Sequence, residues 1–231
     1  PSSTDDLFAL QMLYRYADKG KCKLLGVVVD REGVAGAKVV DIMNTYYDYP
    51  QVPIGLVREG IASPSVWIDY SPLASHTTTE GQLMFRRTHS DYTTLPDGWE
   101  LYRRLLAAQP DHSVSICSVG FVTALAQLLQ SVADEHSPLS GVELVQRKVK
   151  AIYIMGGVFG QAVEPDYNFG QGIGFAQTFF QLWPKEVDMY FSPGEVGDGI
   201  EYPVEQVLED FAWDEYHPIR QVYQNYNCNT G

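Results

Sequence analysis

Two adjacent carboxylates, Asp5 and Asp6, stand at the start of a segment whose apolar residues have helical spacing. Thr4 is a favourable N-cap residue, and Leu7 and Leu10 begin the apolar stripe, so both acids fall in the predicted first turn. Neighbours on a helix point about 100° apart, so the two carboxylates cannot serve one atom in the same way. One could bind Ca²⁺ or Mg²⁺, which take oxygen ligands, while the other faces a polyol. The alternative is that both acids only complement the helix dipole.

Three further groups of polar or flexible residues follow predicted strands. Gly120 permits a sharp turn that leaves the Val119 carbonyl free to coordinate a cation or accept a hydrogen bond. The run M-G-G-V-F-G from Met155 lacks the dinucleotide fingerprint and a Walker lysine, and it favours close backbone approach to a small ligand. Asp166 and Asn168 are predicted to lie on the same side of an extended segment, where they could grip vicinal hydroxyls.

The elements that must position these residues alternate along the chain. Strands are predicted at 23–30, 52–57, 113–119, 149–155 and 187–192. Helices are predicted from Asp5 and at 34–47, 96–108, 122–133, 175–182 and 203–211. This alternation predicts an α/β fold with an open, mostly parallel central sheet and helices on both faces. Such sheets bind ligands at the carboxyl ends of their strands, so we expect Asp5, Asp6, Val119 and Asn168 around one cleft there.

The segment 58–94 is long, polar and aromatic, and it is predicted to form a flap over that cleft. His76 and His89 are candidates for protonating a leaving group. Four aromatic residues are candidates for stacking on a planar ring, namely Trp67, Tyr70, Tyr223 and Tyr226.

Composition excludes several classes of function. The 231 residues, 45% of them apolar, suit one large domain spanning 1–231. A net charge of −13 opposes binding to nucleic acid or to a membrane surface. No run approaches a membrane span and no signal-peptide pattern opens the chain. Cys22, Cys117 and Cys228 are odd in number and far apart, which argues against a disulfide framework and favours a reducing, cytoplasmic compartment.

Together these motifs resemble those of the inosine-uridine-type nucleoside hydrolases, in order and spacing over nearly the whole chain. T-D-D at 4–6 is similar to the second half of the family's opening motif, D-x-D-x-x-x-D-D. G-F-V-T-A-L-A from Gly120 is similar to G-P-L-T-N-L-A, M-G-G from Met155 matches a family strand end, and P-D-Y-N from Pro165 is similar to A-E-F-N.

The resemblance implies the Rossmann-like nucleoside hydrolase fold and hydrolysis of a ribonucleoside's N-glycosidic bond to free base and ribose, as in nucleoside catabolism. It implies that Ca²⁺ holds both the ribose and the attacking water, with Asp6 and the Val119 main-chain oxygen as its ligands. Asp5 and Asp6 are then the predicted catalytic residues. The implied partners are a small nucleoside and further copies of the chain, in a dimer or tetramer. The implied substrate-binding residues are Asp5, Met155, Asp166 and Asn168.

The chain also departs from the family pattern. The family's first aspartates, which include its general base, would precede Pro1, and a late calcium-binding aspartate would lie beyond Gly231. The usual asparagine after the threonine is Ala124, and G-I-G-F-A from Gly172 replaces D-P-E-A-A. We therefore expect both ends of the family domain to be missing from this sequence. Two other functions remain open: a non-catalytic nucleoside- or sugar-binding protein, and metal-dependent phosphoryl transfer.

Overall fold

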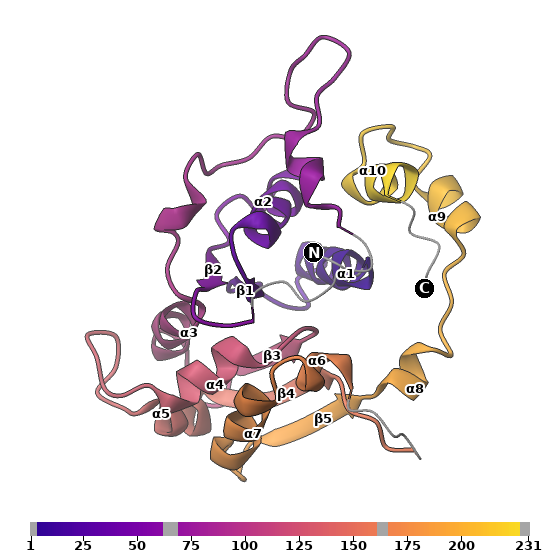
Figure 1. Ribbon diagram of the computed structural model, residues 1–231. Coiled ribbons are helices and arrows are strands. Elements are labelled where there is room, and N and C mark those ends of the chain that lie inside the picture. Colours follow the sequence, from indigo (N-terminus) through magenta and orange to yellow (C-terminus); the bar gives the residue numbers. More distant parts are fainter. Residues whose placement is uncertain (1–3, 62–68, 161–165, 227–231) are drawn as a thin grey trace.

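The computed structural model describes residues 4–61, 69–160 and 166–226, which form an α/β arrangement of short strands and helices (Figure 1). The strands are β1 Val27–Glu32, β2 Ile54–Val57, β3 Val114–Ser118, β4 Val149–Met155 and β5 Asp188–Ser192. The first helices are α1 Asp5–Asp18, α2 Ala35–Tyr46, α3 Gly98–Ala107, α4 Thr123–Gln130 and α5 Gly141–Lys148. They are followed by α6 Tyr167–Gly170, α7 Ile173–Leu182, α8 Gly194–Gly197, α9 Val204–Asp210 and α10 Pro218–Asn225. Two 3₁₀ turns, η1 Ser71–Ser75 and η2 Tyr92–Thr94, lie between β2 and α3.

All pairs of named strands are parallel, which confirms the predicted fold class. The strands form two ladders, β1-β2 and β3-β4-β5, in place of the single sheet that was predicted. Parallel strands run in the same direction, and the register pairs Ser118 with Ile154 and Met155 with Ser192. The carboxyl ends of β3, β4 and β5 therefore lie along one edge of the sheet.

The predicted elements match the observed ones with small shifts at their ends. β4 has the predicted bounds, whereas β1 begins at Val27, four residues later than predicted, and α4 ends at Gln130, three residues early. Four helices, α5, α6, α8 and α10, were not predicted. α5 begins with a complete capping box in which Ser140 and Glu143 satisfy each other's backbone amides.

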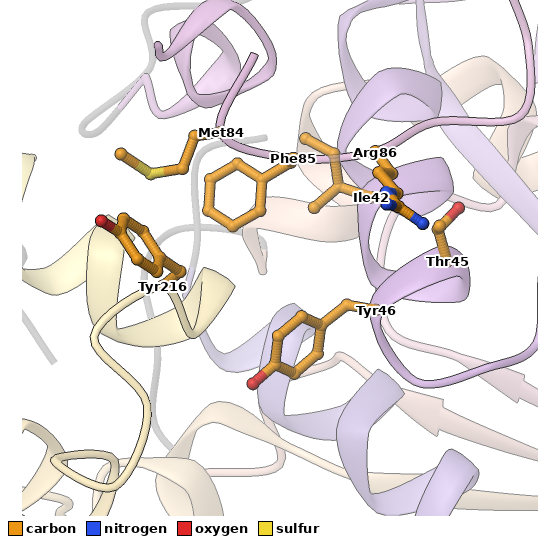
Figure 2. Close-up of a pocket in the computed structure, with 7 residues that line it drawn as sticks. All are labelled: Ile42, Thr45, Tyr46, Met84, Phe85, Arg86 and Tyr216. Atoms are coloured by element: carbon orange, nitrogen blue, oxygen red, sulfur yellow. The ribbon is translucent and has the colours of Figure 1, made fainter. Parts of the chain in front are cut away.

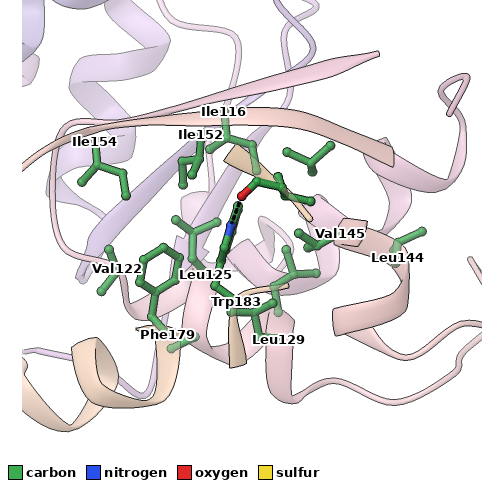
Figure 3. Packing of buried hydrophobic residues seen from close by; sticks show 14 of the residues in the cluster. Ile116, Val122, Leu125, Leu129, Leu144, Val145, Ile152, Ile154, Phe179 and Trp183 are labelled. Atoms are coloured by element: carbon green, nitrogen blue, oxygen red, sulfur yellow. Dashed lines mark hydrogen bonds between the residues drawn. The ribbon is translucent and has the colours of Figure 1, made fainter. Parts of the chain in front are cut away.

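The larger core lies between the β3-β4-β5 sheet and helices α4, α5 and α7 (Figure 3). Ile116, Ile152 and Ile154 point from the strands toward Leu125 and Phe179 on the helices. Trp183, at the end of α7, donates its indole hydrogen to the Val187 carbonyl at 2.9 Å, which fixes the approach to β5. Alternate strand residues therefore anchor one face of the sheet.

The opposite face of this sheet carries an exposed row of side chains. Cys117, Tyr153 and Tyr190 are register partners on β3, β4 and β5, and the two tyrosine rings stack with centroids 5.0 Å apart. Tyr153 and Tyr190 are each about half exposed. Within the described part of the chain, helices thus cover this row less than the facing one.

A second core joins α1 and α2 to α9 and α10. It also takes in Tyr70, Leu73 and Phe85 from the segment after β2. Tyr14 of α1 donates to the Asn44 side chain of α2 at 2.5 Å, deep inside this core. Leu7 and Leu10 are buried as the helical spacing predicts, whereas Thr4 makes no capping hydrogen bond and contacts Tyr223 Oη at 3.0 Å.

Close approach of α3 to both halves depends on Gly98. A Cβ atom at this position would lie 2.6 Å from a Val28 methyl and 3.1 Å from the Ala124 methyl. The absence of a side chain therefore lets α3 pack between β1 and α4. Among the described helices, none combines the length and apolarity required to cross a bilayer.

Candidate functional site

The residues that could bind a ligand or take part in a reaction lie at the carboxyl ends of β1, β3 and β4, as expected for an open α/β sheet. Asp30 and Arg31 lie near the end of β1, where the ladder to β2 is irregular between Val29 and Glu32. Such irregularities redirect side chains and are common beside functional sites. We call Asp6, Asp30, Arg31, Phe121, Tyr167 and Asn168 the strand-end cluster.

Arg31 joins three of the loops in this cluster. Its Nη2 donates to Tyr167 Oη at 3.2 Å, and its guanidinium carbon lies 5.6 Å from the centre of the Phe121 ring. Phe121 belongs to the turn after β3, and Tyr167 opens α6 after β4. The two rings also contact each other, with centroids 5.9 Å apart. Arg31 was not among the predicted site residues, because it follows Asp30, the predicted end of the strand.

The acidic pair occupies the first turn of α1, as predicted. Asp5 is exposed and Asp6 is half-buried. Burial, together with the neighbouring Asp5 carboxylate, raises the pKa of Asp6 to about 7, although the Arg31 guanidinium acts in the opposite direction. The charge of the Arg31 guanidinium therefore reaches the Asp6 carboxyl group within this cluster.

Asp30 is a second carboxylate that sequence reasoning treated only as the end of a strand. Its Oδ1 accepts a hydrogen bond of 2.7 Å from the Ala124 amide in the first turn of α4. Burial raises the pKa of Asp30 to about 7, against the lowering effect of that hydrogen bond. The hydrogen bond holds one carboxylate oxygen against the β3–α4 turn.

The turn from β3 to α4 contains the predicted calcium ligand Val119. Val119 is 42% exposed and follows directly after the last ladder residue, Ser118. The hydroxyls of Ser118 and Thr123, at the two ends of the turn, are buried without a hydrogen-bond partner in the described structure. These orphaned hydroxyls mark the turn as a place where a polar ligand or water would be favoured.

Asp166 and Asn168 differ from the prediction in their backbone. They lie at the start of helix α6 and not on an extended segment, because the Asp166 carboxylate caps the helix. Its Oδ1 accepts from the amides of Asn168 at 3.0 Å and Phe169 at 3.3 Å. The Asn168 side-chain amide donates to the Met155 carbonyl at 3.1 Å, so Asn168 and Met155 are brought together while Asp166 is engaged in capping.

The glycine-rich loop after β4 also has a structural role. A Cβ at Gly156 would lie 2.9 Å from the Phe169 ring, so this glycine allows α6 to close on the strand end. The amides of Phe159 and Gly160 donate to the Glu195 carboxylate at 2.9 and 2.7 Å. The loop amides predicted to approach a small ligand therefore bind a carboxylate of α8.

The two histidines predicted to protonate a leaving group, His76 and His89, have different hydrogen-bond partners. His76 Nε2 and Tyr226 Oη are 2.5 Å apart with their rings stacked. His89 is held by the buried Asp41 of α2, which also accepts from Tyr92 Oη at 2.6 Å.

Of the aromatic residues predicted to stack on a planar ring, Tyr70 and Tyr223 pack against other parts of the protein. Tyr70 is 1% exposed and belongs to the second core. Tyr223 contacts Thr4 at the start of α1, next to the acidic pair. Trp67 lies outside the described residues. Whether the segment after β2 forms a flap stays a prediction, since its residues 62–68 are likewise outside the described structure.

A cavity of about 250 Å³ is formed by another set of residues (Figure 2). Figure 2 shows Phe85, Tyr46, Met84 and Tyr216 around it. The remaining lining residues are Ile42, Thr45 and Arg86. None of the predicted site residues lines it.

The predicted calcium ligands make up only part of a shell. Ca²⁺ takes six to eight oxygen ligands, and Asp6 with the Val119 carbonyl supplies donors of that class. Among residues 4–61, 69–160 and 166–226, no three His, Cys, Asp or Glu side chains gather as a metal-binding group. Calcium binding by Asp6 and the Val119 oxygen therefore stays a prediction.

Comparison with solved structures gives a similar fold in the crystal structure of type III effector protein XopQ complexed with adenosine diphosphate ribose. The TM-score is 0.71 at 18% sequence identity, and the match covers 97% of this chain and 62% of that chain. The likeness shows that the two proteins share an α/β fold, and it assigns the chain to no family. No protein-family model and no curated protein matches the sequence.

Proposed function

We propose that the strand-end cluster binds a ribose-bearing ligand and hydrolyses the N-glycosidic bond of a ribonucleoside. The observation that carries the proposal is the position of Arg31, which contacts Phe121 and Tyr167 and acts on Asp6. The contacts with Phe121 and Tyr167 bring the turn after β3 and helix α6 to the end of β1, and the Arg31 charge acts on Asp6 at the start of α1. The nucleoside hydrolase-like fold and the ADP-ribose held by XopQ support a ribose ligand.

Asn168 is suited to hold the sugar. Its side-chain NH₂ group is fixed on the Met155 carbonyl, which leaves its side-chain oxygen to accept a hydrogen bond from a ribose hydroxyl. Asp5 would accept from a second hydroxyl at the start of α1. Two acceptors fixed on different elements would orient the sugar ring before reaction.

The reaction passes through an oxocarbenium-like state, in which positive charge develops on the sugar. Ionised carboxylates at Asp6 and Asp30 would stabilise that charge, and either could take a proton from the attacking water. A Ca²⁺ ion, with Asp6 and the Val119 oxygen among its ligands, would lower the pKa of a bound water and orient it. His76, hydrogen-bonded to Tyr226, would donate a proton to the departing base.

The experiment is a panel of inosine, adenosine and uridine, assayed for free base and ribose with and without added Ca²⁺. Asp6→Asn should lower turnover about 100-fold or more, a typical loss for a general acid or base, and should weaken Ca²⁺ binding in calorimetry. Asp198→Asn, which removes an exposed carboxylate of the segment after α8, is the control. Unaltered turnover in Asp6→Asn would reject Asp6 as a catalytic residue, and unaltered Ca²⁺ affinity would reject it as a metal ligand.

The second candidate is ribose or nucleotide binding without catalysis. It is favoured by the engagement of Asp166 in helix capping. Saturable binding of adenosine with no release of adenine would establish it over the hydrolase.

A further inference from the structure

We propose that Arg31 binds a phosphate group, so that the ligand of the strand-end cluster is a nucleotide or a nucleoside diphosphate sugar and not a neutral nucleoside. This inference rests on the proposed function and names the class of its ligand. A neutral nucleoside has no group that requires a guanidinium, whereas a phosphate matches its planar array of donors.

The placement of Arg31 suits this role. Phe121 supports the guanidinium at 5.6 Å from the ring centre, and Tyr167 Oη accepts from Nη2 at 3.2 Å. These two contacts fix a side chain that would otherwise lose considerable rotamer entropy on binding. Met155 and Asn168, the predicted sugar contacts, lie on or beside the same loops.

Arg31 is also the sole lysine or arginine in the described segments that form the site. Residues 4–10, 69–76, 118–124, 155–160 and 166–172 contain no Lys or Arg. The Arg31 charge acts to lower the pKa of Asp6. The pKa of Asp69 is lowered mainly by a hydrogen bond from Ser71 and further by the Arg31 charge. In a chain of net charge −13, an anionic ligand at this place depends on that single guanidinium.

Three backbone amides of the kind that commonly binds phosphate are already bound by carboxylates. The Ala124 amide, in the first turn of α4, donates to Asp30. The amides of Phe159 and Gly160 donate to Glu195. Helix N-termini and glycine-rich loops are the usual backbone sites for anions, so their occupation leaves the recognition of phosphate to Arg31.

The test is calorimetric titration of the chain with adenosine and with ADP-ribose, which share the nucleoside and differ in the diphosphate and the second ribose. The wild type should bind ADP-ribose about tenfold or more tighter than adenosine, as one or two charge-assisted hydrogen bonds would give. Arg31→Gln should remove that difference. The readout is the ratio of the two affinities in each variant, because the substitution also removes the contacts of Arg31 with Tyr167 and Phe121, on which binding of both ligands can depend. Arg31→Lys should retain an intermediate preference.

Arg104→Gln is the matched control, since Arg104 is an exposed arginine of α3. It should change neither affinity, and thermal unfolding should verify that each variant is folded. Equal affinities of the wild type for the two ligands would overturn the inference and leave the proposed function standing. An equal loss of both ligands in Arg31→Gln would make Arg31 a positioning residue and would also overturn it. If neither ligand binds the wild type, the proposed function and this inference both fail.

Discussion

At the scale of single residues, the chemistry of this protein is concentrated in carboxyl groups that the fold partly buries. Asp6 and Asp30 both have a pKa near 7, in each case mainly because burial disfavours the charged form. Carboxyl groups of this kind exchange protons near neutral pH, which is the property that acid–base catalysis requires.

The raised pKa of Asp30 has a consequence for stability. A carboxyl group whose pKa is about 7 in the folded protein and 3.8 in the unfolded chain binds more protons when folded, so stability falls as pH rises from about 4 through 7. We predict that Asp30→Asn raises the midpoint of thermal unfolding at pH 8 and leaves it nearly unchanged at pH 4. Asp198→Asn, at an exposed position, should show no such difference. Equal shifts at the two pH values would contradict the assignment.

Asn168 gives a prediction about sugar specificity. Removing the ribose 2′-hydroxyl, or the side chain that pairs with it, costs about 1–3 kcal/mol when a buried polar group is left unpaired. Asn168→Ala should therefore weaken ribonucleoside binding about ten- to hundredfold and weaken 2′-deoxynucleoside binding less. The measurement is calorimetry with inosine and 2′-deoxyinosine. Gln171→Ala, at the exposed end of α6, should preserve the ribose preference, and an unchanged preference in Asn168→Ala would remove Asn168 from the sugar site.

At the scale of elements, α3 connects the two ladders through Gly98 and anchors the connection between α4 and α5 through Arg103. Arg103 is fully buried, and its Nε and Nη2 bond the two oxygens of Asp134 at 2.6 and 2.9 Å. Its Nη2 also donates to the carbonyls of Ser137 and Leu139. The guanidinium thus holds residues 131–139 in place.

We predict that Arg103→Met destabilises the protein by about 3 kcal/mol, the lower part of the range for breaking a buried ion pair, because Asp134 remains partly exposed. Urea unfolding followed by circular dichroism measures the change. Arg104→Met, on the exposed face of the same helix, should change stability by less than about 0.5 kcal/mol. A similar small effect at Arg103 would show that residues 131–139 do not depend on this ion pair.

The sequence was most informative where one signal dominated. Continuous β-branched and apolar runs predicted the strands, and β4 has the predicted bounds. The capping box of Ser140 and Glu143 is a readable helix start, but the helix that follows it has only eight residues, so its apolar periodicity is short. The α6 error arose because alternate spacing of Asp166 and Asn168 fits both an extended segment and a capped turn. Asp166 forms local backbone hydrogen bonds, which decide between the two.

Arg31 could not be assigned from sequence because its contacts are distant along the chain. Its partners Phe121 and Tyr167 are separated from it by roughly 90 and 136 residues. The division into two ladders was likewise hidden, since strand order depends on pairing that no local pattern encodes. Local patterns therefore predicted the elements and most of the candidate residues, whereas the three-dimensional contacts supplied Asp30 and Arg31.

At the scale of the whole molecule, the C-terminal helices are tied to the N-terminal part by His217. This residue precedes α10 and is completely buried. Its Nδ1 accepts from the Ile219 amide at 3.2 Å, and its Nε2 lies 2.9 Å from Tyr47 Oη at the end of α2. Nδ1 must therefore be unprotonated, with the ring neutral.

We predict that this arrangement makes the protein sensitive to acid. Burial lowers the pKa of His217 from 6.5 to about 4, with Asp214 acting against the shift and Arg15 adding to it. Because the folded state binds fewer protons here, the stability contribution is complete above pH 6.5 and is lost as pH falls toward 4. Thermal unfolding between pH 7 and 4.5 should show a falling midpoint, and His217→Gln should flatten that dependence at some cost in stability at pH 7. His112→Asn, which replaces an exposed histidine at positive φ with a residue that tolerates it, should keep the wild-type pH dependence. An unchanged slope in His217→Gln would assign the acid sensitivity to other groups, because the imidazole would then not be what couples α10 to α2.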